Sequence, residues 1–245
     1  MGHDWQALAV VAILGGTTLV RATFGFGDGL IAMPLLAMLL GLSVATPLFA
    51  LVTATIALTL VIRHWREVRL AGAGRLVAGS ALGVPFGLWL LRGSFERELI
   101  LLLAAVVIGF ALFQLLRPRP ARLRASWTAY PVGLLAGVLG GTYNTNGPPV
   151  VIYGTLRRWP PGVFRATLQG YFICTAVVIL SGHALAGLWT ARVWWLFGVS
   201  LLGVLPAIAA GEWLHRRIPT ARFERAIYIL LIPLGTLLAV DALTT

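Results

Sequence analysis

The sequence predicts an all-α polytopic membrane protein with two inverted-topology repeats, each a broken or re-entrant helical hairpin plus three transmembrane helices. Three observations lead to this class. The 245 residues are 59% hydrophobic and only 11% charged, and the mean hydropathy is +0.90. Long apolar runs recur through the chain, and roughly 20 apolar residues are enough to cross a bilayer core. Two polar, glycine-containing stretches interrupt these runs, whereas the alternation of a membrane β-barrel is scarce.

The apolar runs predict helical segments near residues 7–24, 29–41, 44–62, 72–91, 98–116, 129–142, 147–157, 164–182, 193–213 and 226–243. The segments at 29–41, 129–142 and 147–157 are short for a full crossing. They pair with neighbours across GFGDG at 25–29 and TYNTNG at 142–147. Each pair is therefore either a re-entrant hairpin with its tip near mid-membrane or two complete spans. Both alternatives leave the chain on the same side of the membrane.

Arginine accounts for all 19 basic residues of a chain whose net charge is +11. With the segments alternating sides, fifteen arginines fall in the loops at 63–75, 117–124, 157–165 and 216–225, against three on the opposite side, Arg92, Arg97 and Arg192. The positive-inside rule places the arginine-rich loops in the cytoplasm and both chain termini outside it. The charge therefore reports membrane topology, and we expect no nucleic-acid partner.

Short matches between the two halves predict an internal duplication. Asp28-Gly29 resembles Asn146-Gly147, 118 residues later; ATP at 45–47 resembles ATL at 166–168, 121 residues later; and FER at 95–97 recurs at 223–225, 128 residues later. The order is kept and the offset grows as small insertions would make it grow. We expect one transmembrane domain, 1–245, with repeats 1–117 and 125–245. Because the first half enters the membrane from outside and the second from the cytoplasm, the repeats are inverted, as in many secondary transporters.

Two stretches resemble the signatures of the sulfite exporter TauE/SafE family. FGFGDGLIAMPLLAMLLGLSVATPLFAL, at 24–51, is similar to the first signature, and GVLGGTYNTNGPPVVIYGTLRRWPPGVFRATLQGYF, at 137–172, is similar to the second. The resemblance implies a bacterial inner-membrane carrier for small sulfur-containing or organic anions, sulfite and sulfonates among them. Asp28 stands where the family often has a further glycine, and the second turn has fewer glycines than is usual there.

The two breaks predict an oxyanion site. If the second arms begin at Gly29 and Gly147, two helix N-termini face the membrane centre from opposite sides, each with about four unpaired backbone N–H groups and a partial positive charge. Such helix ends bind oxyanions. Pro148 and Pro149 suit a first helical turn, where the missing donor had no partner anyway. Irregular backbone at this depth is tolerated where protein or a wet cavity surrounds it.

Arg21 is the strongest single candidate. A basic residue in an apolar segment costs at least roughly 2.5–3.5 kcal/mol, so it normally faces a partner or a pathway. Asp28 follows seven residues later, close to two helical turns, which leaves two interpretations: a structural ion pair, or an arginine that holds the anion. The complete predicted substrate-binding set is Arg21, Gly27, Asp28, Gly29, Thr46, Tyr143, Asn144, Thr145, Asn146, Gly147, Thr167 and Gln169.

Other interpretations stay open for part of this set. Asp28 and Asn146 are good N-cap residues and could serve only to cap their helices. Thr46 and Thr167 could instead satisfy helix carbonyls or mediate helix packing. Outside the set, we expect the histidines near segment ends to be solvated or interfacial, namely His64, His183 and His215.

The predicted function is secondary transport of small anions (sulfite, sulfonates or related organic anions) across the bacterial inner membrane. An ionised Asp28 beside the anion would repel it. Either Asp28 takes up a proton when the anion binds, which makes transport proton-linked, or Arg21 neutralises it permanently. The expected partners are the anion, a coupling proton and the lipid bilayer, with a homodimer left open and no metal or cofactor. Uptake of small carboxylates is the alternative.

Two other classes of protein were weighed. An intramembrane enzyme would need a catalytic pair, but Ser181 and His183 are two residues apart and point to nearly opposite sides of a helix. The sequence also contains no HExxH motif. We therefore do not expect an enzyme. A non-transporting membrane scaffold is distinguished from a carrier by a flux measurement.

Overall fold

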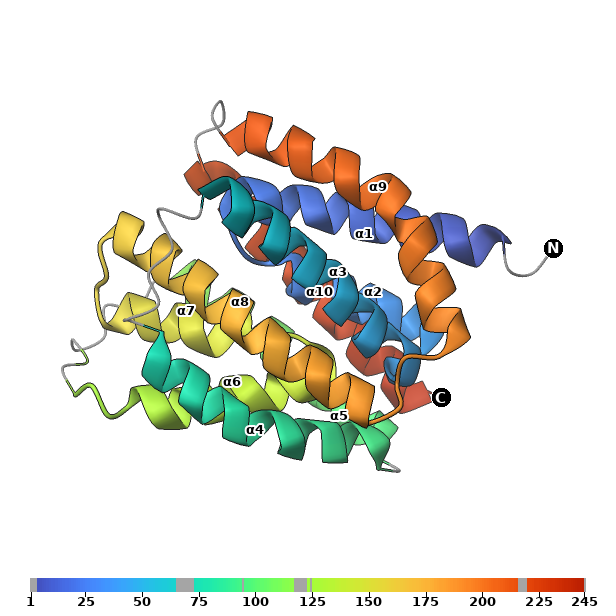
Figure 1. The fold of residues 1–245 in the computed structure, drawn as a ribbon, viewed down its shortest axis with the longest axis horizontal. Coiled ribbons are helices and arrows are strands. Elements are labelled where there is room, and N and C mark those ends of the chain that lie inside the picture. The colour runs from blue at the N-terminus through green and yellow to red at the C-terminus, as the bar shows by residue number, and fades with distance from the viewer. Residues whose placement is uncertain are drawn as a thin grey trace.

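The computed structural model describes residues 4–64, 73–93, 95–116, 123, 125–215 and 220–244, and all the regular structure within them is helical (Figure 1). The helices in chain order are α1 Asp4–Phe24, α2 Asp28–Leu40, α3 Leu42–His64, α4 Gly74–Arg92, α5 Glu96–Leu116, α6 Ala129–Tyr143, α7 Gly147–Leu156, α8 Pro161–Leu185, α9 Ala191–His215 and α10 Thr220–Thr244. Each predicted segment corresponds to one of these helices, so the all-α class is confirmed.

Among the described residues, seven helices are long and apolar enough to cross a membrane: α1, α3, α4, α5, α8, α9 and α10. The other three have 13, 15 and 10 residues, in α2, α6 and α7. At 1.5 Å per residue they extend over about 15–22 Å, which is less than the roughly 30 Å of a bilayer core. The short segments expected from the sequence are therefore short helices, each separated from a neighbour by a break of three residues (25–27 and 144–146).

The first break, between α1 and α2, depends on glycine. Gly25 and Gly27 have φ angles of 89° and 99°, in the left-handed region that side chains other than glycine rarely adopt. The N–H of Gly25 donates to the Arg21 carbonyl at 2.6 Å and closes α1.

The second break, between α6 and α7, uses asparagine in the same way. Asn144 has a φ of 51°, which asparagine tolerates better than most residues. Its N–H donates to the Gly140 carbonyl at 2.9 Å, and the N–H of Thr145 donates to the Leu139 carbonyl at 3.2 Å. The chain thus reverses inside the bundle with these backbone groups satisfied by protein, as membrane depth requires.

A seam of glycines joins α4 to α6. Glycines recur every four residues on both helices, at 79, 83 and 87 on α4 and at 133, 137 and 141 on α6. A Cβ on Gly83 would lie 2.2 Å from the Leu134 carbonyl oxygen, and one on Gly137 would lie 2.3 Å from the Ser80 carbonyl oxygen. The two backbones are therefore in direct contact, the arrangement that small residues permit between membrane helices.

The other main helix contacts join the two halves of the chain crosswise. α1 packs along α9, where a Cβ on Gly211 would lie 2.5 Å from the Ala22 Cβ. α5 packs along α10, and α3 along α8. The start of α1 and the end of α10 lie at the same end of the bundle (Figure 1).

The expectation that His183 is solvated or interfacial is wrong. Its side chain is fully buried, because α8 continues to Leu185 instead of ending near residue 182 and so keeps His183 inside the helix packing. The side chains of His64 and His215 lie outside the part of the chain that the structure describes.

The glycine seam yields a stability prediction. Gly83→Ala places a methyl group 2.2 Å from a backbone oxygen, so the helices must move apart at a cost of about 1–3 kcal/mol or more. Gly109→Ala in α5 is the matched control, because a Cβ there meets nothing within 4 Å and alanine is the better helix former. Thermal unfolding in detergent should show a large loss for Gly83→Ala and none for Gly109→Ala. Equal stability of the two variants would contradict direct contact along the seam.

Candidate functional site

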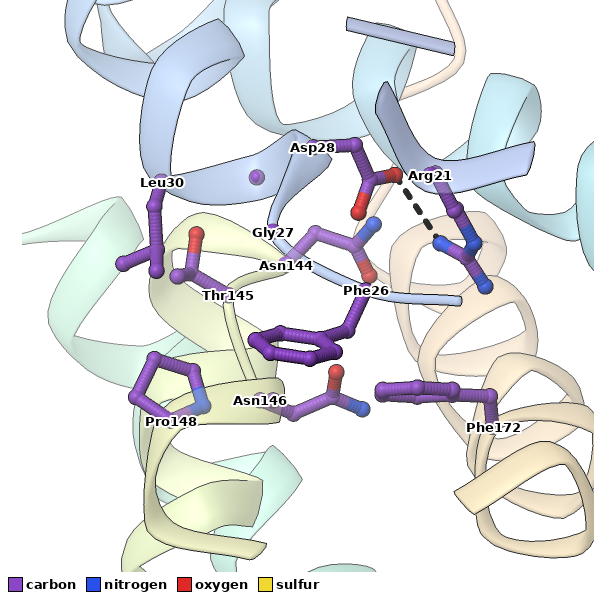
Figure 2. Close-up of a pocket in the computed structure, with 12 residues that line it drawn as sticks. Arg21, Phe26, Gly27, Asp28, Leu30, Asn144, Thr145, Asn146, Pro148 and Phe172 are labelled. Atoms are coloured by element: carbon purple, nitrogen blue, oxygen red, sulfur yellow. Dashed lines mark hydrogen bonds and ion pairs between the residues drawn. The ribbon is translucent and has the colours of Figure 1, made fainter. Parts of the chain in front are cut away.

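The two helix breaks meet around a small cavity, hereafter the central cavity (Figure 2). Its volume is about 30 Å³, room for about two water-sized groups. Segments more than 100 residues apart in the sequence contribute to it: the end of α1, the two breaks, the starts of α2 and α7, and one residue of α8. The lining residues are Arg21, Phe26, Gly27, Asp28, Gly29, Leu30, Asn144, Thr145, Asn146, Gly147, Pro148 and Phe172.

Neither polar residue at the break ends acts as a helix cap through its side chain. α2 has Gly27 at its N-cap, so Asp28 is the first helical residue, and no side-chain cap bond forms. Asn146 does occupy the N-cap of α7, but without a side-chain cap bond; its amide donates instead to the Thr175 hydroxyl on α8 at 3.1 Å. The capping interpretation therefore fails for both residues, and their side chains are used in contacts across the cavity.

The two helix N-termini differ in their donors. An α-helix leaves about four N–H groups unpaired at its N-terminus, and α2 begins with Asp28, Gly29 and Leu30, which all line the cavity. α7 begins Gly147-Pro148-Pro149, and proline has no N–H group. The two donor clusters expected from the sequence are therefore unequal, and the start of α2 has more backbone N–H donors than the start of α7.

A buried ion pair lies at the edge of the cavity. Arg21 Nη1 donates to Asp28 Oδ2 at 3.0 Å, and the two side chains are 5% and 8% exposed. The Arg21 guanidinium also lies 5.0 Å from the centre of the Phe172 ring, within range of a cation–π interaction. Its Nε is buried and has no hydrogen-bond partner in the described part of the chain. The structure therefore contains the ion pair, and the Nε of Arg21 is a donor left without a partner among the described residues.

A second, smaller cavity of about 20 Å³ lies on another side of Arg21. It shares Arg21, Asn144, Asn146 and Phe172 with the central cavity and adds residues of α3 and α8: Thr53, Thr175, Ala176 and Ile179. The Asn144 amide donates to the Thr53 hydroxyl at 2.7 Å. Both break asparagines are therefore held by threonines of neighbouring spans, which fixes their direction at the cavity.

The structure brings most of the predicted site residues together. Those that line the central cavity are Arg21, Gly27, Asp28, Gly29, Asn144, Thr145, Asn146 and Gly147. The remaining four, Thr46, Tyr143, Thr167 and Gln169, do not line it.

Two of these four have structural hydrogen bonds. The Thr46 hydroxyl donates to the Thr142 carbonyl at 2.9 Å, in line with the helix-packing interpretation. The Tyr143 hydroxyl donates to the Leu99 carbonyl at 2.7 Å and its side chain is fully buried. Thr167 is also buried. These contacts secure α6 against α3 and α5 rather than facing the cavity.

Sequence reasoning missed the apolar wall of the cavity, which consists of Phe26, Leu30, Pro148 and Phe172. Phe26 carried a local signal, because it stands between the two glycines of the first break. Phe172 carried none, because it reaches the cavity from α8, a separate span whose orientation depends on tertiary packing. Within the described residues, no group of three potential metal-ligating side chains gathers anywhere.

A buried charged cavity between two helix breaks, inside a bundle of membrane-length helices, is characteristic of secondary membrane transporters. The comparison with known families agrees. The family model described as sulfite exporter TauE/SafE matches residues 8–238. The chain therefore belongs to this family of multi-pass membrane transporters, which is not a family of enzymes.

Two curated proteins are similar to the chain. The "Probable sulfite/organosulfonate exporter TauE" of Cupriavidus necator is 27% identical over 249 residues, which cover 97% of this chain and 95% of that protein. The "Probable inner membrane transporter protein TsaS" of Comamonas testosteroni is 29% identical over 175 residues, covering 70% and 73% respectively. No solved structure matches the chain. The expected multi-pass inner-membrane transporter is confirmed by its family, which is one of transporters and not of enzymes.

The ion pair yields a prediction about stability. Arg21→Gln leaves the buried Asp28 carboxylate without its partner, and breaking a buried pair in this way costs about 3–5 kcal/mol. The double variant Arg21→Gln/Asp28→Asn removes both charges and should recover most of that loss. Unfolding in detergent measures the stability of both variants relative to the wild type.

The control for these two variants is the ion pair between Arg63 on α3 and Glu212 on α9. Its arginine side chain is 50% exposed, so Arg63→Gln should lose at most about 1 kcal/mol. If Arg21→Gln is as stable as Arg63→Gln, the buried pair does not stabilise the fold as described.

Proposed function

We propose that the protein is a secondary transporter that carries small oxyanions, sulfite or sulfonates, across the bacterial inner membrane through the central cavity. The observation that carries this proposal is the buried Arg21, which shares the cavity with the N-terminus of α2. Sulfite and organosulfonate appear in the name of the relative from Cupriavidus necator. The family supports transport of anions across the membrane. The donors in the central cavity support small oxyanions as the class of anion.

The cavity offers an oxyanion complementary donors of two kinds. Backbone N–H groups at the start of α2 point along the helix axis and carry partial positive charge. The guanidinium of Arg21 donates in a planar fork that matches two oxygens of one anion. A pyramidal or tetrahedral oxyanion has enough oxygens to engage both donor sets at once, which supports compact sulfur oxyanions as the ligand class.

The charges in the cavity support transport that is linked to protons. Without ligand, Arg21 and Asp28 neutralise each other at 3.0 Å. An anion that binds Arg21 competes with the Asp28 carboxylate, and the two negative groups repel strongly where the dielectric constant is low. Proton uptake by Asp28 removes this repulsion and restores a neutral site. In this mechanism, anion and proton bind together and cross together.

Alternating access fits an inverted duplication, with repeats 1–117 and 125–245 and with both termini outside the cytoplasm. The contacts between the two halves support this. The first helix of the first half, α1, packs on the fourth helix of the second half, α9. In the same way, the first helix of the second half, α6, packs on the fourth helix of the first half, α4. Side-chain contacts follow the same exchange. Arg63 at the end of α3 pairs with Glu212 near the end of α9, and Arg92 at the end of α4 donates to the Ala186 carbonyl after α8. The two contacts join α3 to α9 and α4 to the end of α8, which are equivalent helix pairs under an inverted repeat.

The proposed function is tested by flux into liposomes containing purified protein. Sulfite and methanesulfonate should enter saturably, ahead of sulfate and acetate. The comparison that isolates Arg21 is Asp28→Asn against Arg21→Gln/Asp28→Asn, because both lack the buried carboxylate and only the second lacks the guanidinium. A hydrogen bond to a charged group contributes about 1.5–3 kcal/mol, so the double variant should bind the anion about 10- to 100-fold more weakly than Asp28→Asn.

The matched control for this flux measurement is Arg192→Gln. The Arg192 side chain is exposed and contacts Gln6, so wild-type flux is expected. Equal anion affinity in Asp28→Asn and the double variant would exclude Arg21 from the site. Saturable entry of acetate without entry of sulfur oxyanions would instead identify a carboxylate carrier.

Proton coupling is tested by the pH profile of methanesulfonate flux. This anion stays ionised over the accessible pH range, so any pH dependence belongs to the protein. Asp28→Asn keeps the size and the hydrogen-bonding capacity of the side chain but cannot titrate, and it should flatten the profile. Glu98→Gln is the control, because Glu98 is exposed at the start of α5 and should leave the profile unchanged. A wild-type pH profile in Asp28→Asn would exclude Asp28 as the coupling group.

A further inference from the structure

We propose that Phe26 divides the central cavity from an apolar subsite that takes the organic group of a sulfonate, and that Phe26 sets the length of the group admitted. This inference rests on the proposed function, since it assumes that the oxyanion head binds at Arg21. Within the sulfonates already proposed, it adds a subsite for the organic group and a residue that selects the length of that group.

The apolar subsite is a third cavity, of about 10 Å³, next to the central one. The two share three lining residues, Phe26, Gly27 and Leu30. The others come from α1 and α10, and none is charged: Val20, Ile227, Tyr228 and Leu231. The Tyr228 hydroxyl accepts a hydrogen bond from Gln114 at 3.0 Å, so this polar group already has a protein partner. What the subsite offers a ligand is apolar contact.

Phe26 is well placed to act as a divider. It lies outside both helices, between Gly25 and Gly27 with their φ angles of 89° and 99°, and a Cβ on either glycine would meet nothing within 4 Å. Its ring packs edge-on against Phe110 with 6.5 Å between ring centres. Figure 2 shows the ring between Asn144 and Asn146 at the cavity. Changing this side chain therefore alters the wall between two cavities without altering a helix.

The chemistry of an organosulfonate matches this division. Its three oxygens and its carbon group lie on opposite sides of the sulfur atom, so a head held by Arg21 and the start of α2 directs the carbon group away from them. An inorganic oxyanion such as sulfite has no such group and leaves the subsite empty. Burying one methylene is worth about 0.8 kcal/mol, or about fourfold in affinity. A space of about 10 Å³ takes about one water-sized group, so the gain should end after one or two carbons.

The test measures how well alkanesulfonates of increasing length compete with sulfite for entry into liposomes. In the wild type, ethanesulfonate should bind about fourfold more tightly than methanesulfonate, and butanesulfonate should bind more weakly than ethanesulfonate. Phe26→Ala widens the opening between the two cavities, so the affinity for butanesulfonate relative to sulfite should rise at least tenfold. Expressing the result as a ratio removes any general effect of the variant on folding or transport.

A second variant approaches the subsite from the other side. Ile227→Phe on α10 adds bulk to a half-buried lining position and should abolish the preference for ethanesulfonate over methanesulfonate. Phe86→Ala is the matched control, because this phenylalanine is 52% exposed on α4 and stacks on Trp89; it should keep the wild-type length profile.

The outcomes separate this inference from the function on which it rests. If the wild type transports sulfite but both Phe26→Ala and Ile227→Phe keep the wild-type length profile, the subsite proposal is wrong and the anion site stands. If the wild type shows no preference for ethanesulfonate over methanesulfonate, the subsite is likewise excluded. If no sulfur oxyanion enters at all, the proposed function itself fails.

Discussion

The backbones of α4 and α6 are in direct contact, with no side chains between them. This contact determines the position of the second break, at residues 144–146, because that break directly follows α6. The Ser80 hydroxyl on α4 donates to the Gly133 carbonyl on α6 at 2.8 Å, and the Thr142 hydroxyl on α6 donates to the Gly87 carbonyl on α4 at 3.1 Å. Glycines spaced every four residues allow the close approach, and these two hydrogen bonds select one register of the two helices. The last turn of α6 is thereby fixed, and the break that follows it is carried to the middle of the bundle. The contact of Gly211 on α9 with Ala22 on α1 does the same beside Arg21.

The low polarity of the bilayer limits which groups can surround the two breaks. A polar group at this depth must have a protein partner or a wet cavity. Asn144 and Asn146 therefore donate to threonines of α3 and α8, and Arg21 pairs with Asp28. The polar side chains around the cavity form such contacts, while the Nε of Arg21 has no partner among the residues that the structure describes. The proposed anion site needs a free donor of this kind, and the other polar side chains have to be rigid to keep that donor in place.

The positions of the helices and the polar character of the two breaks could be predicted from the sequence, because both leave local signals in it. Hydrophobic runs mark membrane helices, glycine and asparagine mark left-handed turns, and a lone arginine in an apolar run marks a buried partner. Phe172 and the apolar wall left no such signal, since they reach the cavity through the packing of α8. Tyr143 was predicted to line the site because it adjoins the break in sequence, but it does not line the central cavity. The last turn of α6 directs its hydroxyl to the Leu99 carbonyl of α5 instead. Proximity along the chain predicts the position of a backbone better than the direction of a side chain.

The pairing of Arg21 with Asp28 also bears on how a carrier can return empty. Moving a net charge through a low-dielectric interior is expensive, so a conformational cycle is fastest when the site is neutral at each crossing. A lone arginine would be neutral only with the anion bound, and its empty return would carry a charge. In the proposed mechanism, the pairing with Asp28 at 3.0 Å keeps the empty site neutral, and a proton that arrives with the anion would keep the loaded site neutral. A glycine at position 28 would leave the empty site charged, and its carrier would move an anion without this balance. The carboxylate thus makes proton-linked transport consistent with both halves of the cycle.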